Sequence, residues 1–223
     1  MNLKSVLSRF KTKIKSNPKV FVIGFNKTGT TTLKFTLRDL GYKIGNQRHG
    51  ESIIEDWKLG NFDSLISLCR TADAFQDIPF SLPETYIHLY DNFENAKFVL
   101  SVRDDSDQWY QSICNFHSKL WAEGQGLPNS EQMRCADYLY KGYAYESFKM
   151  IFGTPDDDLY NKDILVGKYN DHNESVRRFF LDKSSSFLEV NVAKDTDYIK
   201  LCNFLAKEPK GAGFLWENET SKI

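Results

Sequence analysis

The stretch Lys19-Val-Phe-Val-Ile-Gly-Phe-Asn-Lys-Thr-Gly-Thr-Thr-Thr-Leu33 decides the fold of this chain. It opens with a short run of mostly apolar, β-branched residues, which is typical of a buried strand. A turn with two glycines and one lysine follows, and the leucines after Thr30 recur at helical spacing until Gly41. The stretch therefore predicts a strand, a glycine-bounded loop and a helix in direct succession.

This succession is suited to binding an anion. The first N–H groups of a helix lack intrahelical partners, and the helix dipole adds positive potential at the same end. Three consecutive threonines, Thr30, Thr31 and Thr32, bring hydroxyl donors to that end. The loop therefore predicts a ligand that carries a phosphate or a sulfate group.

The loop differs from the nucleotide-binding P-loop in the place of its lysine. The Walker pattern has lysine directly after the second glycine, followed by serine or threonine. Here Thr30 follows Gly29, and Lys27 lies two residues before that glycine. An alternative interpretation is a tight strand-to-helix turn with an exposed lysine. Threonine is a poor helix former, however, and anion binding would explain three of them at the start of a helix.

Composition limits the class of protein. Of the 223 residues, 41% are apolar, enough for a large core, and we expect one α/β domain over residues 19–223. A net charge of −1 argues against nucleic acid as a partner. The cysteines are scattered without a CxxC pair, which indicates thiols in a reducing compartment. No apolar run reaches the roughly 20 residues of a membrane span, and no signal-peptide core is present, so we expect a cytoplasmic protein.

Residues 1–18 differ from the rest of the chain in charge. They contain only basic charged side chains, and the apolar residues Leu3, Leu7, Phe10 and Ile14 fall at helical spacing. The segment predicts a short basic amphipathic helix. Such a helix could make weak contact with an anionic membrane surface, but packing against its own domain is the interpretation we favour.

Further along the chain, apolar runs alternate with helical patterns. Strands are predicted over residues 72–77, 97–102 and 187–192. Helices are predicted over residues 51–70, 82–93, 131–152, 171–182 and 197–205, and another is predicted with Asp105 or Ser106 as its cap. This alternation indicates an α/β fold with a central parallel sheet, right-handed crossovers and flanking helices. Ligands of such sheets bind beyond the carboxyl ends of the strands, which places the 24–32 loop, Asp77 and Arg103 along one edge.

The loop Gly24-Phe-Asn-Lys-Thr-Gly-Thr-Thr-Thr-Leu33 resembles the 5′-phosphosulfate loop of the sulfotransferases that use 3′-phosphoadenosine-5′-phosphosulfate (PAPS). The segment Lys97-Phe-Val-Leu-Ser-Val-Arg-Asp104, followed by Trp109-Tyr-Gln-Ser112, is similar to their 3′-phosphate motif. Residues 169–176, 187–192 and 201–205 resemble the C-terminal half of one branch of that superfamily.

The resemblance implies a P-loop NTPase-like three-layer sandwich. It also implies transfer of a sulfuryl group from PAPS to a hydroxyl or an amine, with PAP as the product and without a metal. Lys27 would stabilise the leaving phosphate, and Arg103 and Ser112 would bind the 3′-phosphate. The donor-binding residues implied in this way are Asn26, Lys27, Thr28, Gly29, Thr30, Thr31, Thr32, Arg103 and Ser112.

The general base rests on analogy. Gln76-Asp-Ile-Pro79 resembles the segment in which cytosolic members carry a catalytic histidine, and Asp77 stands at that position. Rival bases are His49, His88, His117 and Glu51. We expect the acceptor to be a small molecule or a glycan, and its pocket to be built from residues 44–75 and 115–165, which contain many aromatic side chains.

Two other functions compete with sulfuryl transfer. A small-molecule kinase would need a lysine after Gly29 and an aspartate at a strand end to hold Mg²⁺, but the third strand ends at Arg103. A catalytically silent nucleotide-binding protein would not need both Lys27 and Asp77, and both are present.

Overall fold

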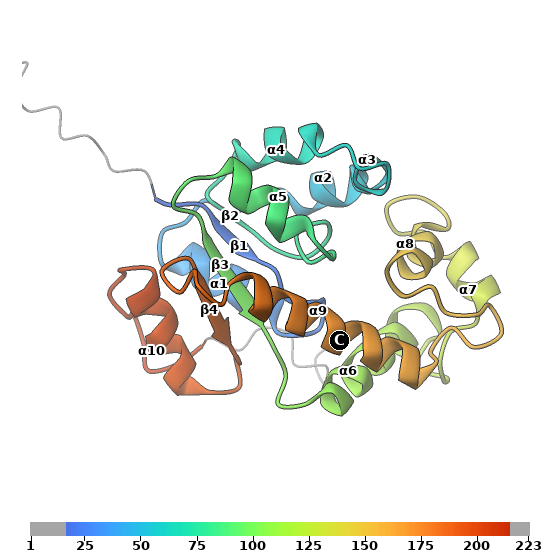
Figure 1. Ribbon diagram of the computed structural model, residues 1–223. Coiled ribbons are helices and arrows are strands. Elements are labelled where there is room, and N and C mark those ends of the chain that lie inside the picture. Colours follow the sequence, from blue (N-terminus) through green and yellow to red (C-terminus); the bar gives the residue numbers. More distant parts are fainter. Residues whose placement is uncertain (1–16, 215–223) are drawn as a thin grey trace, which may run out of the picture.

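The computed structural model describes residues 17–214, and within them one parallel sheet forms the centre of the molecule. Its strands lie in the order β2-β1-β3-β4 (Figure 1). Their bounds are β1 Val20–Val22, β2 Ala74–Phe75, β3 Lys97–Ser101 and β4 Phe187–Val190. The predicted α/β fold with a central parallel sheet is therefore confirmed. β1 and β3 are the two inner strands, and the residues of β1 are buried on both faces of the sheet.

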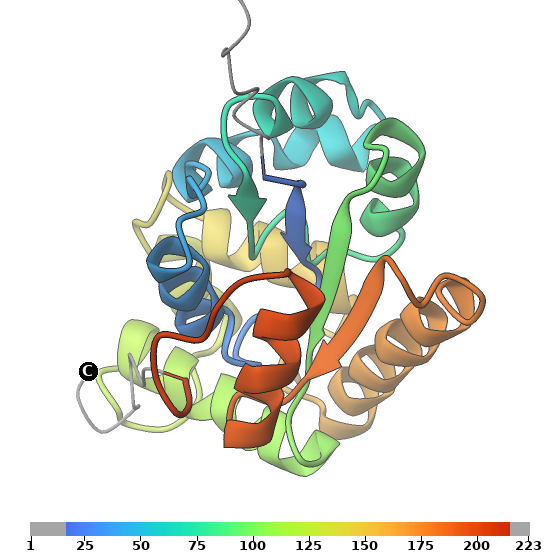
Figure 2. The same cartoon turned by 90° about the vertical axis from the view of Figure 1, so that its left-hand side faces the viewer.

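Helices cover both faces of the sheet, which makes three layers (Figures 1 and 2). Alternate strand residues such as Phe21 and Phe98 pack on one face against α4, α5 and the end of α9. The residues between them, such as Val22 and Val99, pack on the other face against α1 and α10. The bounds are α1 Thr30–Asp39, α4 Asp63–Cys69, α5 Thr85–Asn92, α9 Lys162–Phe179 and α10 Asp195–Phe204. This arrangement is consistent with the P-loop sulfotransferase fold.

A separate helical core lies beyond the carboxyl ends of the strands. It is formed by α6 Ser106–Trp121, α7 Ser130–Cys135, α8 Tyr143–Phe152 and the first half of α9. Trp109 lies at its centre, fully buried, and stacks on Tyr169 with 4.6 Å between the ring centroids. Phe25, from the loop after β1, packs into the same core and joins it to the sheet.

Several predicted helices have different bounds in the structure. Residues 51–70 form not one helix but the end of α2 Gln47–Ser52, then α3 Ile54–Lys58 and α4. The single helix predicted over 131–152 is also wrong, because Ala136 is extended and Gly142 adopts a left-handed φ of 92° between α7 and α8. The helix predicted over 171–182 is part of α9, which begins nine residues earlier, where Asn161 caps it.

The remaining predicted elements are close to the observed ones. The strand predicted over 72–77 is only two residues long, since the chain at Asp77 turns to a φ of 59°. Asp105 caps α6, as one of the two predicted alternatives. The basic helix predicted over residues 1–18 falls mostly on residues 1–16, which lie outside the described residues. Within residues 17–214, no helix combines the length and apolar character that crossing a bilayer requires.

Candidate active site

A cavity of about 450 Å³ lies between the carboxyl ends of the strands and the helical core. The loops after β1, β2 and β3 contribute Asn26, Asp77 and Arg103 to its wall. Helices α2, α6 and α8 contribute Glu51, Phe116 and Tyr143, among others. The edge of the sheet predicted to hold the ligand is thus the edge on which the cavity lies.

The start of α1 offers free backbone donors to this cavity. Leu33 donates the first intrahelical bond, to the Gly29 carbonyl at 3.0 Å, so the amides of residues 30–32 have no intrahelical acceptor. Gly29 has a φ of 97°, and a Cβ there would lie 2.4 Å from Cγ2 of Val192. The second glycine of the loop is therefore required both by backbone conformation and by the close approach of Val192.

The structure places the predicted loop residues in two groups. Thr30, Thr31 and Thr32 line the cavity together with Asn26, whose carbonyl accepts from Trp109 Nε1 at 3.0 Å. Thr28 lies on the opposite side of the loop. Its hydroxyl donates to the Phe25 carbonyl at 2.6 Å and so accepts from the Ser101 hydroxyl at 2.6 Å. Thr28 therefore ties the loop to β3.

Lys27 extends from the loop into the cavity. Its φ is 72°, and its Nζ lies 3.7 Å from the centroid of the Phe116 ring. Burial and the neighbouring Arg103 lower the pKa of Lys27 to about 8, while Asp77 acts in the opposite direction. A half-buried ammonium with this pKa can donate a hydrogen bond or a proton near neutral pH.

Arg103 is held in a fixed orientation by its neighbours. Its Nε donates to the Lys27 carbonyl at 2.7 Å, and its Nη2 donates to Ser112 Oγ at 3.3 Å. The adjacent acids have other partners, since Asp104 accepts from Asn191 at 2.7 Å and Asp105 caps α6. The structure thus brings the predicted pair of Arg103 and Ser112 together and leaves further N–H groups of the guanidinium for an anion.

Asp77 lies in the same cavity, almost fully buried. Its carboxylate accepts a hydrogen bond from the Thr30 hydroxyl, whereas Oδ1 has no partner within residues 17–214. Burial raises the pKa of Asp77 to about 6; Glu51 adds to the increase, and Lys34 and Lys27 oppose it. An unpaired carboxylate oxygen with this pKa is suited to accept a proton at neutral pH.

The histidines are less suitable as bases. His49 is exposed on α2, and His88 stacks on Phe62 with 3.6 Å between the ring centroids; neither lines the cavity. His117 does line it, but burial and Lys27 lower its pKa to about 3, and its Nδ1 lies 2.8 Å from Tyr160 Oη. His172 contacts the backbone just before the 24–32 loop, with its Nε2 2.8 Å from the Ile23 carbonyl.

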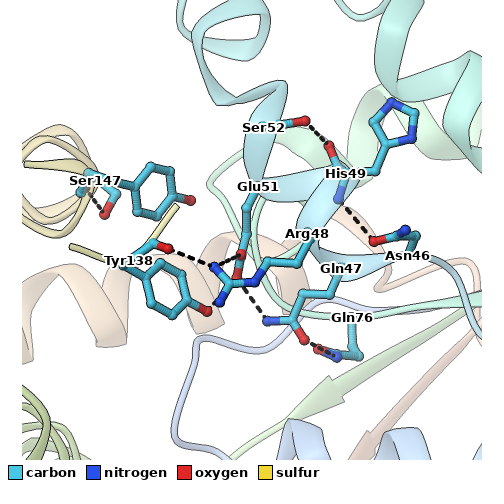
Figure 3. Close-up of polar contacts among 10 residues, drawn as sticks. Asn46, Gln47, Arg48, His49, Glu51, Ser52, Gln76, Tyr138 and Ser147 are labelled. Carbon is cyan, nitrogen blue, oxygen red and sulfur yellow. Dashed lines mark hydrogen bonds and ion pairs between the residues drawn. The ribbon is translucent and has the colours of Figure 1, made fainter. Parts of the chain in front are cut away.

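Glu51 is a second buried carboxylate on the cavity wall, and its contacts bridge two parts of the chain (Figure 3). Its Oε1 accepts from Gln47 at 3.0 Å and from the hydroxyl of Tyr138 at 3.1 Å. Gln76 in turn donates to Gln47 at 3.0 Å. Burial raises the pKa of Glu51, and these hydrogen bonds oppose the increase.

Most of the contacts that join Glu51 to Gln47, Gln76 and Tyr138 were not predicted from the sequence. Gln47-Arg-His-Gly-Glu-Ser52 has no apolar periodicity that would indicate a helix, although Asn46 three residues before His49 is a capping signal. Tyr138 and Tyr143 were expected near the acceptor only as two of many aromatic residues. Their places depend on the break between α7 and α8, which was not predicted.

The residues present fit a ligand with two anionic groups. Free amides at the start of α1 and Lys27 line one part of the cavity. The guanidinium of Arg103 also lines it, and it bonds Ser112, which does not itself line the cavity. Within residues 17–214, no three or more histidine, cysteine, aspartate or glutamate side chains are grouped as ligands for a metal ion.

Comparison with known proteins agrees with this geometry. No curated protein sequence matches the chain. The family described as the sulfotransferase domain matches it over residues 19–223, which includes every residue of the cavity. That family transfers sulfuryl groups, and it implies PAPS as their donor. Because the match covers almost the whole sequence, the chain belongs to the sulfotransferase domain family.

Proposed function

We propose that this protein transfers the sulfuryl group of PAPS to a hydroxyl or an amine of a small-molecule or glycan acceptor. One observation carries the proposal: Lys27, Arg103 and Asp77, from the ends of three different strands, meet in one cavity at the start of α1. A cation for each end of the donor and a base for the acceptor are what this reaction needs.

The donor side of the cavity has a separate group for each anion. Arg103, with Ser112, binds the 3′-phosphate through charge-assisted hydrogen bonds. The amides of residues 30–32 and the hydroxyl of Thr31 bind the 5′-phosphate. Asn26 and Thr28 hold the shape of the loop through Trp109 and Ser101. When bound, PAPS supplies the sulfuryl group and leaves as PAP.

Asp77 takes up the proton of the acceptor, and Lys27 stabilises the leaving oxygen. Asp77 Oδ1 accepts the proton of the acceptor hydroxyl as its oxygen bonds to sulfur. The bond between sulfur and the bridging phosphate oxygen breaks at the same time, and Lys27 donates a hydrogen bond to that oxygen as its charge grows. Thr30, bonded to Asp77, couples the anion loop to the base.

Calorimetric titration with PAP and with ATP, each with and without Mg²⁺, tests this function against its rivals. We expect PAP to bind without Mg²⁺ and more tightly than ATP. Tighter binding of ATP with Mg²⁺ would instead favour a kinase. Mass spectrometry across a panel of acceptors supplied with PAPS should then detect the mass of one added sulfuryl group. PAP binding with no transfer to any acceptor would favour a silent nucleotide-binding protein.

A further inference from the structure

Three polar atoms in the cavity wall are buried and have no hydrogen-bond partner within residues 17–214. They are Oε2 of Glu51, Oδ1 of Asp77 and the hydroxyl oxygen of Tyr143. All three residues line the cavity, and they come from α2, from the loop after β2 and from the start of α8. Buried polar atoms are nearly always paired in folded proteins, so three unpaired ones on one cavity indicate a ligand that pairs with them.

Glu51 is held so that Oε2 stays available. Gln47 and Tyr138 both donate to Oε1, and Gln76 fixes Gln47 in turn. Arg48 approaches Oε2 only to 3.7 Å, and its side chain is 56% exposed. An ion pair of that kind is weak, because water screens it. The carboxylate is therefore oriented by the protein but not neutralised by it.

The surroundings of Glu51 and Asp77 determine what can fill the space. The negative charge of Glu51 raises the pKa of Asp77, so the two carboxylates lie close enough to repel each other. A group that donates hydrogen bonds would relieve this repulsion, whereas an anionic group would increase it. The α6 and α8 part of the wall adds apolar and aromatic side chains, among them Phe116, Trp121, Phe148 and Ile151.

We propose that Glu51, together with Tyr143, binds a second O–H or N–H donor on the acceptor, next to the hydroxyl that is sulfated. This inference rests on the proposed function, in which Asp77 accepts the proton of the reacting hydroxyl. The substrate class is an amphipathic alcohol with an apolar or aromatic body and a neighbouring hydroxyl or amino group. Alcohols with a carboxylate at that position are excluded by Glu51.

Three matched alcohols test the inference. Phenethyl alcohol, styrene glycol and phenylglycinol share one ring and one terminal hydroxyl, and differ in carrying hydrogen, hydroxyl or amine on the benzylic carbon. Their binding to the protein saturated with PAP is measured by calorimetry, and their sulfation with PAPS is measured as kcat/KM. We expect the diol or the amino alcohol to exceed phenethyl alcohol by about tenfold to a hundredfold, the range for a hydrogen bond to a charged group.

Glu51→Gln identifies the residue responsible. It keeps the shape of the side chain but replaces the charged acceptor by an amide, so the preference for the second donor should fall by about tenfold or more. Glu55→Gln is the matched control, because Glu55 is an exposed glutamate on the neighbouring helix α3 and does not line the cavity. It should keep the wild-type preference. Thermal melts and PAP titrations establish that both variants are folded.

The outcomes separate this inference from the proposed function. A protein that does not bind PAP, or transfers nothing from PAPS to any alcohol that it binds, contradicts the proposed function. Transfer without preference among the three alcohols contradicts the proposed role of Glu51 but not the proposed function. PAP binding with no affinity for any of the three alcohols has the same meaning. An equal loss on all three alcohols in Glu51→Gln would make Glu51 the base and would also overturn the inference.

Discussion

The side of the cavity proposed to bind the donor is made by loops that directly follow strands, whereas the side proposed to bind the acceptor is made by helices that contact one another through side chains. Lys27 and Arg103 belong to the donor side, and Arg103 is bonded to the backbone of Lys27. Asp77 also follows a strand, and it lies where the two sides meet. On the acceptor side, α2 and the segment before α8 meet through side chains: the Tyr138 hydroxyl donates to Glu51, and Arg48 donates to the Tyr138 carbonyl. We infer that the donor side is fixed by the sheet, and that the acceptor side can vary while the fold remains the same.

The largest effect is expected at Asp77, where the two sides meet. Asp77→Asn should lower kcat by roughly 10²- to 10⁴-fold, the size of a lost general base, and leave PAP affinity nearly unchanged. Asparagine accepts the positive φ of 59° at this position, so the backbone need not move. Steady-state kinetics and PAP titration measure both quantities. Unchanged turnover would mean that Asp77 only shapes the turn.

A thermal melt provides the structural control for this variant. The folded protein raises the pKa of Asp77 from 3.8 to about 6, so folding becomes less favourable as the pH rises through that interval. An uncharged asparagine avoids this cost, and the melting temperature at neutral pH should stay the same or rise. A variant that unfolds would contradict the assignment of Asp77 to catalysis alone.

Lys27→Ala tests the donor side itself. It should lower kcat by roughly 10²- to 10³-fold, since one donor to the leaving oxygen is lost, and weaken PAP less. Alanine at this position has the same unfavourable φ of 72° as lysine, so the substitution isolates the side chain. Turnover near that of the wild type would remove Lys27 from the mechanism.

The two sides also differ in how far they could be predicted. The positions of Lys27 and Arg103 on the cavity wall were predictable because both residues lie within a few positions of strands with contiguous apolar runs, β1 and β3. Within it, the inward orientation of Thr28 could not be predicted, since it depends on contact with Ser101, far away in the sequence.

The acceptor side could not be assembled from sequence because its contacts join segments far apart. Glu51 and Tyr138 are 87 residues apart, and neither lies in a pattern that indicates its partner. The break at Gly142 has a sequence signal, since glycine is unfavourable inside a helix, but the aromatic residues around it favoured one continuous helix.

Arg103→Ala should affect binding rather than chemistry. Loss of a charge-assisted contact of about 1.5–3 kcal/mol weakens PAP by roughly 10- to 150-fold. Affinity for AMP, which lacks the 3′-phosphate, should barely change, and Ser112→Ala should show the same pattern more weakly. Titration of both nucleotides measures the effect. A variant that keeps the preference for PAP would place the 3′-phosphate elsewhere.

The pH dependence of kcat/KM should have two limbs. Asp77 must be deprotonated to accept a proton, so activity rises with pH through about 6. Lys27 must be protonated to donate, so activity falls as the pH passes about 8. Each limb should change by about tenfold per pH unit beyond its pKa, and Asp77→Asn should abolish the acidic limb. A profile without an acidic limb in the wild type would contradict the role of Asp77.

The smallest effect is expected at Tyr138, where it tests whether the two sides are independent. Tyr138→Phe removes one of two hydrogen bonds to Glu51 Oε1, leaves the other from Gln47, and keeps the ring on which Arg48 stacks at 4.0 Å. The preference for an acceptor with a second donor should therefore fall by only about threefold to tenfold, in line with one ordinary hydrogen bond. Affinity for PAP should stay the same, because sites without shared partners respond additively. Tyr145→Phe is the matched control, since the Tyr145 hydroxyl bonds Asp156 at 2.7 Å on the exposed surface. If PAP affinity falls together with the acceptor preference, the acceptor side helps to hold the donor loop, and the division of the cavity into two independent sides is wrong.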